Sequence, residues 1–591
     1  MIFPGFLRLL LAGLASGAPK GVPILPPEPF ASVGTSAGPE SIETRVVPAS
    51  GQGFKSALEV SVKAHCDNSW DLQVRFPTSA PVAKGDTLHL SLWMRCTMSK
   101  DETGEGRASL VFETVPGWHK SLEEDVTAGH EWRRMDVPFT ALHDMPAGGG
   151  SLNIRLGYGL QTVELGEVRL TDCGKSVSPD TLPRTRATYR GMEKNAPWRK
   201  AARERILRYR TGELAVTVRD AAGKPVPGAL VRARMARHAY LFGSETSLKY
   251  LIVNKDTPDG RKYREWIPKL FNTAVEGGGF KWDAWEGQWG PGYTPENSIA
   301  SVRWLREQGL TVRGHVLVWP SWRYLPKSLR ALEKEPAALR KRILDHIREE
   351  AGSVKGMMAQ WDVVNEPFDN HDLLDILGRE AMVDWFREAH ATDPDAALFL
   401  NDYALLAGGG GDTPHRRHFD DTVRFLLASK APLDALGIQG HFGSMPTPPE
   451  EMLKLLDRYA AHGLPLYITE FDHTTADEEF QGRFMRDLLT VFFSHPATKG
   501  FVMWGFWDGC HWKDNSPIFR RDWSVKPAGK AWMDLVLKEW WTDAEARTDS
   551  SGRAVIRGFL GDYSVAAKAK GRETGRTAAI APGGSSIDLT L

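Results

Sequence analysis

The sequence has no surplus of charge of either sign, and this absence excludes a class of partner. Its 74 Lys and Arg residues balance 74 Asp and Glu residues, so the formal net charge is zero. Proteins that bind nucleic acid or an anionic membrane surface through charge carry a basic excess. We therefore expect no nucleic-acid partner.

Cysteine is also scarce. The four cysteines are Cys66, Cys96, Cys173 and Cys510, and none lies in a CxxC or Cys/His spacing typical of a metal site. We expect neither a bound metal nor a cofactor. A disulfide among the first three cysteines stays open, so cysteine usage does not indicate the redox compartment.

Long apolar runs are missing, apart from a short one at the start. No stretch is long and apolar enough for a membrane helix. Residues 1–18 hold one Arg, an apolar run from Leu9 to Leu14 and small residues from Ala15 to Ala18, which is the pattern of a signal peptide. This predicts an exported protein, secreted or periplasmic. A disordered or added segment is the alternative.

The chain of 591 residues is too long for a typical single domain. Residues 28–173 alternate apolar and polar positions in short runs such as LEVSVKA and LHLSLWMR, with Gly, Pro, Asp and Asn between them. This pattern predicts an all-β sandwich. A polar stretch over 174–211, containing the helical pattern WRKAARERILRYR, is expected to be a linker.

Residues 212–545 begin with a predicted strand pair and then alternate strand-like runs with amphipathic helical stretches. The expected barrel strands are YLFGSET, FNTAVE, TVRGHVLVW, AQWDVVNE, ALFLNDY, ALGIQGH, PLYITEFD and FVMWGFWD. Eight such units predict an α/β fold, the (β/α)₈ TIM barrel. An open doubly wound sheet usually has a Gly-rich phosphate loop, which is missing here. Residues 546–591 return to β-like alternation and are expected to pack beside the barrel.

Acidic side chains end two of the expected barrel strands. Glu366 ends the fourth and Glu470 ends the seventh. Active sites of such barrels lie at the carboxyl ends of the strands, although any single polar strand end is ordinarily just solvated. Two carboxyls facing each other across one barrel mouth are what glycoside hydrolysis requires. The 21 Trp residues include several near the same strand ends and supply flat faces for sugar rings.

The same motifs carry a family resemblance. WDVVNEP, YITEFD, GIQGH, RGHVLVW, LNDY and WGFWDGCHW occur in that family's order, and the match covers most of residues 238–540. This part of the chain resembles glycoside hydrolase family 10, the endo-β-1,4-xylanases. NEP alone would be weak, because several barrel glycosidase families share it.

The resemblance implies a role for each matching residue. Glu366 would be the acid/base, Glu470 the nucleophile, and Asn365 the partner of the sugar 2-hydroxyl. His441 would hydrogen-bond Glu470 and be oriented by Asp472. The residues implied to line the sugar subsites are Lys281, His315, Trp319, Gln439, Trp504 and Trp512.

Two positions depart from the family pattern. Gly277 and Gly278 stand where the family has a Glu and an Asn that bind the distal sugar, so we expect weaker or different binding there. Glu276 and Glu286 are the candidates to compensate. Pro320 replaces the family's usual His.

The N-terminal sandwich resembles jelly-roll carbohydrate-binding modules of families 4, 9 and 22, in pattern and order. Trp70, Trp93, Trp118 and Tyr158 are its candidate sugar platforms, and core packing is the alternative for each.

Together these features predict a monomeric, retaining endo-1,4-β-xylanase that cleaves a polysaccharide substrate by double displacement. Two alternatives stay open. The same barrel chemistry could act on another β-1,4-glycan, a branched xylan or a glucan, or the barrel could be a degenerate glycan-binding protein. The presence of Asn365, Glu366 and Glu470 speaks against a degenerate barrel that only binds glycan.

Overall fold

The chain forms two compact units. A computed structural model describes residues 20–101, 103–443 and 446–591, so the predicted signal peptide over 1–18 lies outside the described residues. The chain divides between residues 186 and 187. Within the described residues, no helix has the length and apolar character needed to cross a membrane.

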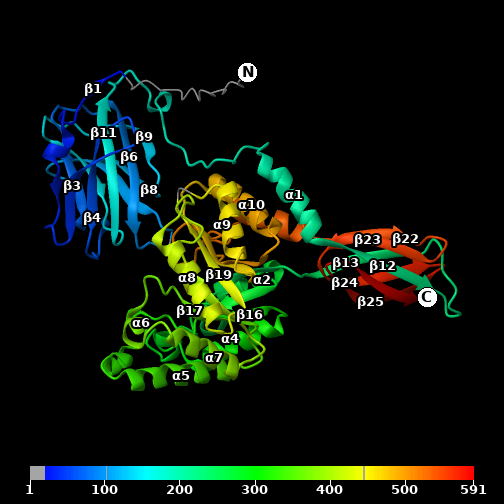
Figure 1. Ribbon diagram of the computed structural model, residues 1–591. Helices are drawn as coiled ribbons and strands as arrows, with labels where there is room; N and C mark the ends of the chain where they lie inside the picture. Colours follow the sequence, from blue (N-terminus) through cyan, green and yellow to red (C-terminus); the bar gives the residue numbers. More distant parts are fainter. Residues whose placement is uncertain (1–19, 102, 444–445) are drawn as a thin grey trace, which may run out of the picture. The chain divides into compact units, whose positions relative to one another are not determined.

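The first unit is built from two antiparallel sheets, seen in blue and cyan in Figure 1. One sheet has the order β3-β4-β11-β6-β9, with β1 also paired to β11, and the other has the order β2-β5-β10-β7-β8. Alternate residues of β6, such as Leu88, Leu90, Leu92 and Met94, are buried in the core. The predicted all-β sandwich is therefore confirmed. Its strands are β1 (Val22–Pro23), β2 (Gly34–Thr35), β3 (Ile42–Pro48), β4 (Ser56–Val62), β5 (Gln73–Pro77), β6 (Thr87–Ser99), β7 (Gly106–Thr114), β8 (Lys120–Ala128), β9 (Arg133–Thr140), β10 (Gly150–Arg155) and β11 (Gln161–Asp172).

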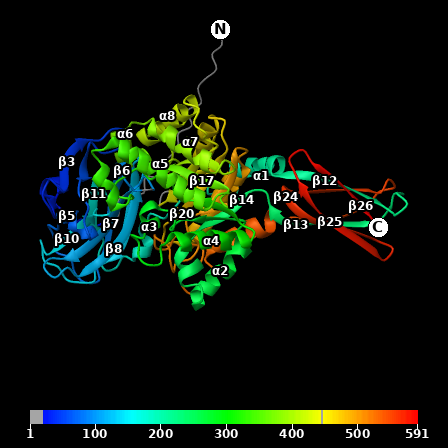
Figure 2. The ribbon, with the colours of Figure 1, turned by 90° about the horizontal axis from the view of Figure 1, so that it is seen from below.

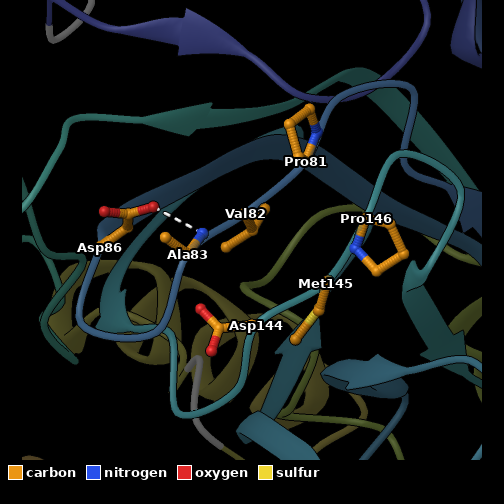
Figure 3. A pocket seen from close by; sticks show the side chains of 7 residues that line it. All are labelled: Pro81, Val82, Ala83, Asp86, Asp144, Met145 and Pro146. Atoms are coloured by element: carbon orange, nitrogen blue, oxygen red, sulfur yellow. Dashed lines mark hydrogen bonds between the residues drawn. The ribbon is translucent and has the colours of Figure 1, made fainter.

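A pocket of about 420 Å³ lies between two loops of this unit (Figure 3). Val82 and Met145 join the loops by a pair of backbone hydrogen bonds, both 2.8 Å. The Asp86 carboxylate accepts from the Ala83 amide at 2.7 Å, and Asp144 accepts from a backbone amide at 2.8 Å. Both acidic side chains are therefore engaged in holding the loops.

The second unit contains a closed barrel of eight parallel strands, in the order of the sequence. Each strand was expected from its motif, so the predicted (β/α)₈ barrel is confirmed. The barrel occupies the green to orange part of the chain in Figure 1. The strands are β14 (Leu241–Thr246), β15 (Thr273–Glu276), β16 (Thr311–Gly314), β17 (Gln360–Asn365), β18 (Ala397–Asp402), β19 (Ala435–Phe442), β20 (Leu466–His473) and β21 (Thr498–Met503).

Helices follow the barrel strands and bury one apolar face each. The start signal at Thr294 and Pro295 is realised, because the Thr294 hydroxyl accepts from the Asn297 amide at the first turn of α4. The helices are α2 (Pro258–Leu270), α3 (Trp282–Trp285), α4 (Pro295–Glu307), α5 (Pro336–Ser353), α6 (Asp372–Leu377), α7 (Ala381–Thr392), α8 (Pro414–Ala428), α9 (Pro449–Ala460), α10 (Glu478–Ser494) and α11 (Pro527–Asp534).

Two smaller sheets in the second unit pair segments from both ends of the barrel. One has the order β23-β12-β26 and the other β22-β13-β24-β25. Figures 1 and 2 both show β12 and β13 among the C-terminal strands. The strands are β12 (Thr211–Arg219), β13 (Leu230–His238), β22 (Asp543–Arg547), β23 (Arg553–Phe559), β24 (Gly561–Ala569), β25 (Arg572–Ile580) and β26 (Ser585–Thr590).

Arg210 connects these sheets to the barrel. It lies between β12 and helix α1 (Pro197–Tyr209), which falls within the stretch expected to be a linker. Its buried guanidinium donates to the carbonyls of Phe493 at 2.6 Å, His495 at 2.5 Å and Thr498 at 2.8 Å. These bonds satisfy carbonyls at the end of α10 and in the turn that leads into β21.

Candidate active site

Glu366 follows β17 directly and is 6% exposed. Its backbone φ is 54°, in the left-handed region that residues other than glycine rarely adopt. Its amide donates to the Asn401 carbonyl at 2.9 Å, which ties this conformation to the end of the neighbouring strand β18. Uncommon backbone conformations of this kind gather at functional sites.

Glu470 lies within β20 and is 4% exposed. The pairing of β20 with β21 shifts register between Ile468 and Phe471, and the pairing with β19 shifts between Ile438 and Gln439. Such bulges re-aim side chains next to active sites. Both Glu470 and Gln439 therefore leave the regular barrel pattern at the point where they meet the cleft.

A chain of side-chain amides joins the two carboxyls. Gln439 Nε2 donates to Glu366 Oε1 at 2.9 Å and to Asn365 Oδ1 at 3.3 Å. Asn401 Nδ2 donates to the same Asn365 oxygen at 2.9 Å and to Glu470 Oε1 at 2.7 Å. The four strands β17 to β20 thus contribute to one continuous network. Its members are buried, Asn365 and Asn401 completely.

His441 and Asp472 hold Glu470 as an anion. His441 Nε2 lies 3.4 Å from Glu470 Oε2, and His441 Nδ1 lies 2.9 Å from Asp472 Oδ2. Burial alone would raise the pKa of Glu470, but the His441 hydrogen bond, the charges of His315 and His441, and Asn401 together lower it. Burial would lower the pKa of His441, yet Asp472 raises it to about 9. His441 is therefore a cation at neutral pH.

His315 approaches the same carboxylate from just beyond β16. Its Nδ1 lies 3.0 Å from Asp362 Oδ2 and 3.9 Å from Glu470 Oε1. Asp362 is also ion-paired with the fully buried Arg313. A charged second layer inside the barrel therefore fixes the imidazole beside Glu470.

Aromatic rings form the walls of the cleft. Trp319 stacks on Tyr324 with a centroid separation of 3.6 Å, and Lys281 Nζ lies 5.3 Å from the ring centres of Trp319 and Trp289. Trp504 meets His315 edge-on at 4.9 Å. These half-buried rings offer flat apolar faces next to the carboxyls.

Trp512 covers the Asp472 side of the cleft. Its Nε1 donates to Asp472 Oδ2 at 2.9 Å, and its ring meets the His441 ring edge-on at 5.2 Å. The indole is still 49% exposed, so it presents a free face to solvent. Trp512 is therefore held in place by the hydrogen bond of its Nε1 while about half of its surface stays accessible to solvent.

Several buried donors point into the site without a partner among the described residues. They include Asn365 Nδ2 and Trp319 Nε1. A buried donor without a hydrogen bond is costly, and a ligand often satisfies it. Gln439 Oε1 is an unpartnered acceptor in the same group, so a ligand that can both donate and accept hydrogen bonds fits this site.

The predicted site residues lie within one continuous set of contacts: Lys281 lies beside Trp319, Trp319 and Trp504 lie beside His315, and His315 lies beside Glu470. Sequence reasoning named the LNDY motif but gave Asn401 no role, although this residue donates to both halves of the network. It also missed Asn370, whose side-chain amide donates to Glu366 Oε2 at 3.1 Å. The position of Asn401 at a strand end was the available signal.

Part of the chain matches a known family and several of its members in sequence. The sequence model of glycosyl hydrolase family 10 matches residues 233–535. Endo-1,4-beta-xylanase B of Paenibacillus barcinonensis is 31% identical over 260 residues, 39% of this chain and 76% of that protein. Native xylanase 10B of Thermotoga maritima is a structural neighbour at 24% identity and a TM-score of 0.46, covering 51% of this chain and 96% of that chain.

Longer relatives also match more than half of the chain. Anti-sigma-I factor RsgI6 of Acetivibrio thermocellus is 30% identical over 377 residues, 64% of this chain and 47% of that protein. Endo-1,4-beta-xylanase 1 of Arabidopsis thaliana is 27% identical over 339 residues, 57% of this chain and 34% of that protein. The chain thus spans less than half the length of these two relatives. The match of the family model over more than half of the sequence shows that the chain belongs to glycosyl hydrolase family 10.

Proposed function

We propose that the chain is a retaining endo-hydrolase of β-1,4-xylan backbones. The observation that carries this proposal is the pair of buried carboxyls, Glu366 and Glu470, joined by one amide network and placed in contrasting surroundings. Relatives named endo-1,4-beta-xylanase in the same family support xylan as the substrate.

In the proposed mechanism, the Glu470 carboxylate attacks the anomeric carbon while Glu366 donates its proton to the departing glycosidic oxygen. The shortened glycan leaves, and the other part stays bound to Glu470 as an ester. Glu366, now a carboxylate, removes a proton from water, which attacks the same carbon and releases Glu470. Two inversions retain the anomeric configuration. Retaining enzymes place the carboxyls about 5–5.5 Å apart.

The surrounding residues suit this assignment. His441, oriented by Asp472, supplies positive charge beside the nucleophile, and the free Nδ2 donor of Asn365 suits the sugar 2-hydroxyl. Lys281, His315, Trp319, Gln439, Trp504 and Trp512 would line the subsites on either side of the cleaved bond.

Two alternatives follow from the same site. A branched xylan or a β-1,4-glucan would use the same two carboxyls. Gly277 and Gly278 have no side chain to contact the distal sugar, so the preferred glycan has to be found by experiment. A degenerate, binding-only barrel is disfavoured, because a pure binder has no need of a histidine that lowers the pKa of Glu470.

The decisive experiment measures reducing-end release from xylan, branched xylan and β-glucans by the wild type, Glu366→Ala and Glu470→Ala. We expect cleavage of xylan by the wild type and a loss of about 10⁴-fold or more in both variants, since each carboxyl acts in both steps. The anomer formed first, followed by NMR, tests retention. Binding of xylan by the wild type without cleavage of any of these glycans would refute the proposed hydrolase activity.

Export and domain roles belong to the same proposal. Residues 1–18 would direct secretion or periplasmic export, 28–173 would form a carbohydrate-binding domain, and 174–211 would connect it to the hydrolase. Residues 212–545 would form the hydrolase, with 546–591 as its β extension. Mass spectrometry of the exported protein would locate the cleavage site.

A second function, glycan binding by the first unit, is favoured by one face of its β2-β5-β10-β7-β8 sheet. The indoles of Trp70 and Trp118 are each 50% exposed there. Arg155 lies 5.5 Å from the Trp70 ring centre, and Arg75 lies 5.7 Å from that of Trp118. Tyr158 stacks under an arginine of β7. Trp93 instead lies on β6 of the other sheet and packs against Phe54.

Polar side chains fill the surface between these rings. Asn153 Nδ2 donates to Glu113 at 2.6 Å, and Arg155 donates to Glu113 and to Glu123. Asn153 is fully buried and Glu113 nearly so, although both lie on the face that points away from the core of the sandwich. These buried polar side chains therefore support the surface from below, and the exposed indoles are the groups that suit a sugar chain.

The test uses the full chain with Glu470→Ala, so that the glycan is not consumed. We expect Trp70→Ala with Trp118→Ala to weaken binding to insoluble xylan by about 30-fold, because each stacked ring contributes about 1 kcal/mol. Val46→Ala, an exposed apolar change on the other sheet, is the matched control. Equal retention of all three proteins would exclude this binding face.

A further inference from the structure

The loop after β15 carries three consecutive glycines, and the side chain of Glu245 lies over the first of them. A Cβ on Gly277 would lie 2.5 Å from Glu245 Cγ and 3.0 Å from Glu245 Oε1. A Cβ on Gly505, across the cleft rim, would lie 3.7 Å from Glu245 Oε2. The Glu245 carboxyl therefore fills the space that a side chain at position 277 would take.

The strand order explains this position. In β14, Glu245 pairs with Val275 of β15, and Ser244 pairs with Met503 at the end of β21. Glu245 is thus flanked by the loop that carries Lys281 and by the segment that carries Trp504. Its neighbours in the strand, Ser244 and Thr246, are fully buried, whereas Glu245 keeps part of its surface open.

The charges around Glu245 place it on the nucleophile's side of the cleft. Burial raises the pKa of Glu245 to about 7, the Lys281 cation opposes this rise, and the Glu470 anion adds to it. The sugar that becomes attached to Glu470 occupies the glycone side of the cleft. Glu245, which stands between the loop that carries Lys281 and the segment that carries Trp504, is therefore assigned to the glycone side, where a sugar hydroxyl would meet it.

The other two acidic residues near this loop are already engaged. Glu276 is fully buried, and its Oε2 accepts from the Gly279 amide at 2.8 Å. Glu286 accepts from Trp282 Nε1 at 2.9 Å and from Arg342 at 2.8 Å, away from the cleft. The Glu245 carboxyl, in contrast, accepts no hydrogen bond from the described residues.

We propose that Glu245 binds the hydroxyl groups of the distal glycone-side sugar, the one beyond the sugar that is attacked. It replaces, from a neighbouring strand, the side chains that Gly277 and Gly278 lack. The ligand class is a neutral pentosyl unit with free hydroxyls, and a sugar bearing an acidic substituent would be repelled when Glu245 is ionised. This inference rests on the proposed hydrolysis of β-1,4-xylan.

The test compares two synthetic substrates with the same aryl leaving group, a β-xyloside and a β-xylobioside. Only the bioside has a distal glycone-side sugar. Glu245→Ala and Glu245→Gln should lower kcat/KM for the bioside by about 10- to 100-fold, since a hydrogen bond to a charged group contributes about 1.5–3 kcal/mol. The loss for the monoside should be much smaller. Glu286→Gln, which changes a carboxyl at the end of α3, just beyond this loop, is the matched control.

A position swap tests the geometry itself. Gly277→Glu alone should impair bioside cleavage, because its Cβ would collide with Glu245 Cγ. In the Glu245→Ala background the space is vacant, so Gly277→Glu should recover at least part of the lost bioside activity. A strongly positive coupling between the two changes is the expected result.

Three outcomes would overturn the inference: unchanged bioside kinetics in both Glu245 variants, an equal loss on both substrates, or no recovery in the double variant. Thermal unfolding of each variant separates misfolding from lost binding. If the wild type cleaves neither substrate, the proposed function fails. Calorimetric binding of xylohexaose to the wild type and Glu245→Gln then decides the role of Glu245.

Discussion

The two carboxyls of the site differ in the groups that surround them. Glu470 receives a hydrogen bond from Asn401 and lies beside the His441 cation. Glu366 accepts hydrogen bonds from the side-chain amides of Gln439 and Asn370. A cation stabilises an anion, so His441 favours the ionised form of Glu470.

Asn401 offers a direct test of this asymmetry. Asn401→Ala should lower kcat/KM on xylan by about 10²-fold, because a preorganised donor to the reacting carboxylate is lost. The pKa of Glu470 should rise, so the acidic limb of the pH profile should move to higher pH. Steady-state kinetics across pH check both effects.

Thr469→Val is the control, since Thr469 Oγ1 only orients Asn401, by donating to its Oδ1 at 2.6 Å. It should cause a smaller loss. An acidic limb that stays in place in Asn401→Ala would contradict the assigned donor.

His441 makes stability depend on pH with a defined sign. Its pKa in the folded protein is about 9, above its ordinary value of 6.5. The stabilisation from its charge is therefore complete below pH 6.5 and is lost as pH rises through 9. The stability difference between the wild type and His441→Asn, measured by denaturant unfolding, should shrink over this range. A difference that stays constant from pH 6.5 to 10 would refute a charged His441.

The sequence allowed prediction of site residues that belong to a recognisable strand motif. It did not allow prediction of residues whose role depends on a contact with a neighbouring strand or loop. Glu366, Glu470 and His441 could be named because each ends a recognisable strand motif. Glu245 could not, since its role depends on the space left by Gly277 in the loop after the neighbouring strand β15. The register between β14 and β15, which brings Glu245 to that loop, is not contained in any local pattern.

Among the elements, the loop between β15 and α3 is shaped by its contact with α4. A Cβ on Gly279 would lie 2.2 Å from Ser298 Oγ, whereas a Cβ on Gly278 would lie 3.4 Å from Tyr293 Cε1. Ser298 Oγ also donates to the Gly279 carbonyl at 3.0 Å. The two neighbouring glycines therefore differ in the room they leave for a side chain.

Gly279→Ala should consequently lower the melting temperature by several degrees, as overpacking costs about 1–3 kcal/mol. Gly278→Ala should change it little. Differential scanning fluorimetry of the two variants is the measurement, and adding Ser298→Gly to Gly279→Ala should restore part of the loss. Equal melting of both single variants would argue against this tight contact.

The barrel strands could be predicted because buried parallel strands read as short apolar runs. The predicted ends of these strands were less accurate. In the structure β16 stops at Gly314 and β21 at Met503, so His315 and Trp504 lie just beyond the hydrogen-bonded strands. The pairing of β12 with both β23 and β26 joins segments more than 300 residues apart. Alternation indicates such strands but does not specify their partners.

At the scale of the whole molecule, the two compact units have separate cores. The small sheets have a core of their own, which includes Ile556, and they meet the barrel through Arg210 and through Phe559, which packs against both cores. Perturbing the small sheets should therefore affect catalysis by the barrel, and perturbing the first unit should not.

Ile556→Ser and Leu90→Ala compare the two units. Each replaces a buried residue, in β23 and in β6 respectively. Ile556→Ser should lower the temperature at which xylan hydrolysis is lost, whereas Leu90→Ala should lower only the melting of the first unit. Residual activity after heating, alongside calorimetry of the full chain, provides the comparison. Val555→Ser, exposed on the same strand as Ile556, should change neither. Inactivation by Leu90→Ala at the same lower temperature would show that the units unfold together.

The amide network also has a direction. Asn365 Oδ1 accepts from both Gln439 and Asn401, so the Asn365 amide cannot turn over without breaking two bonds. Its Nδ2, which has no hydrogen-bond partner among the described residues, is the donor proposed above for the sugar 2-hydroxyl. A sugar without a hydroxyl at that point would leave the Asn365 N–H buried in the complex without a hydrogen bond. The binding free energy would be less favourable for that sugar. The site would then bind a deoxy sugar more weakly because the sugar lacks this hydroxyl, although nothing blocks its entry.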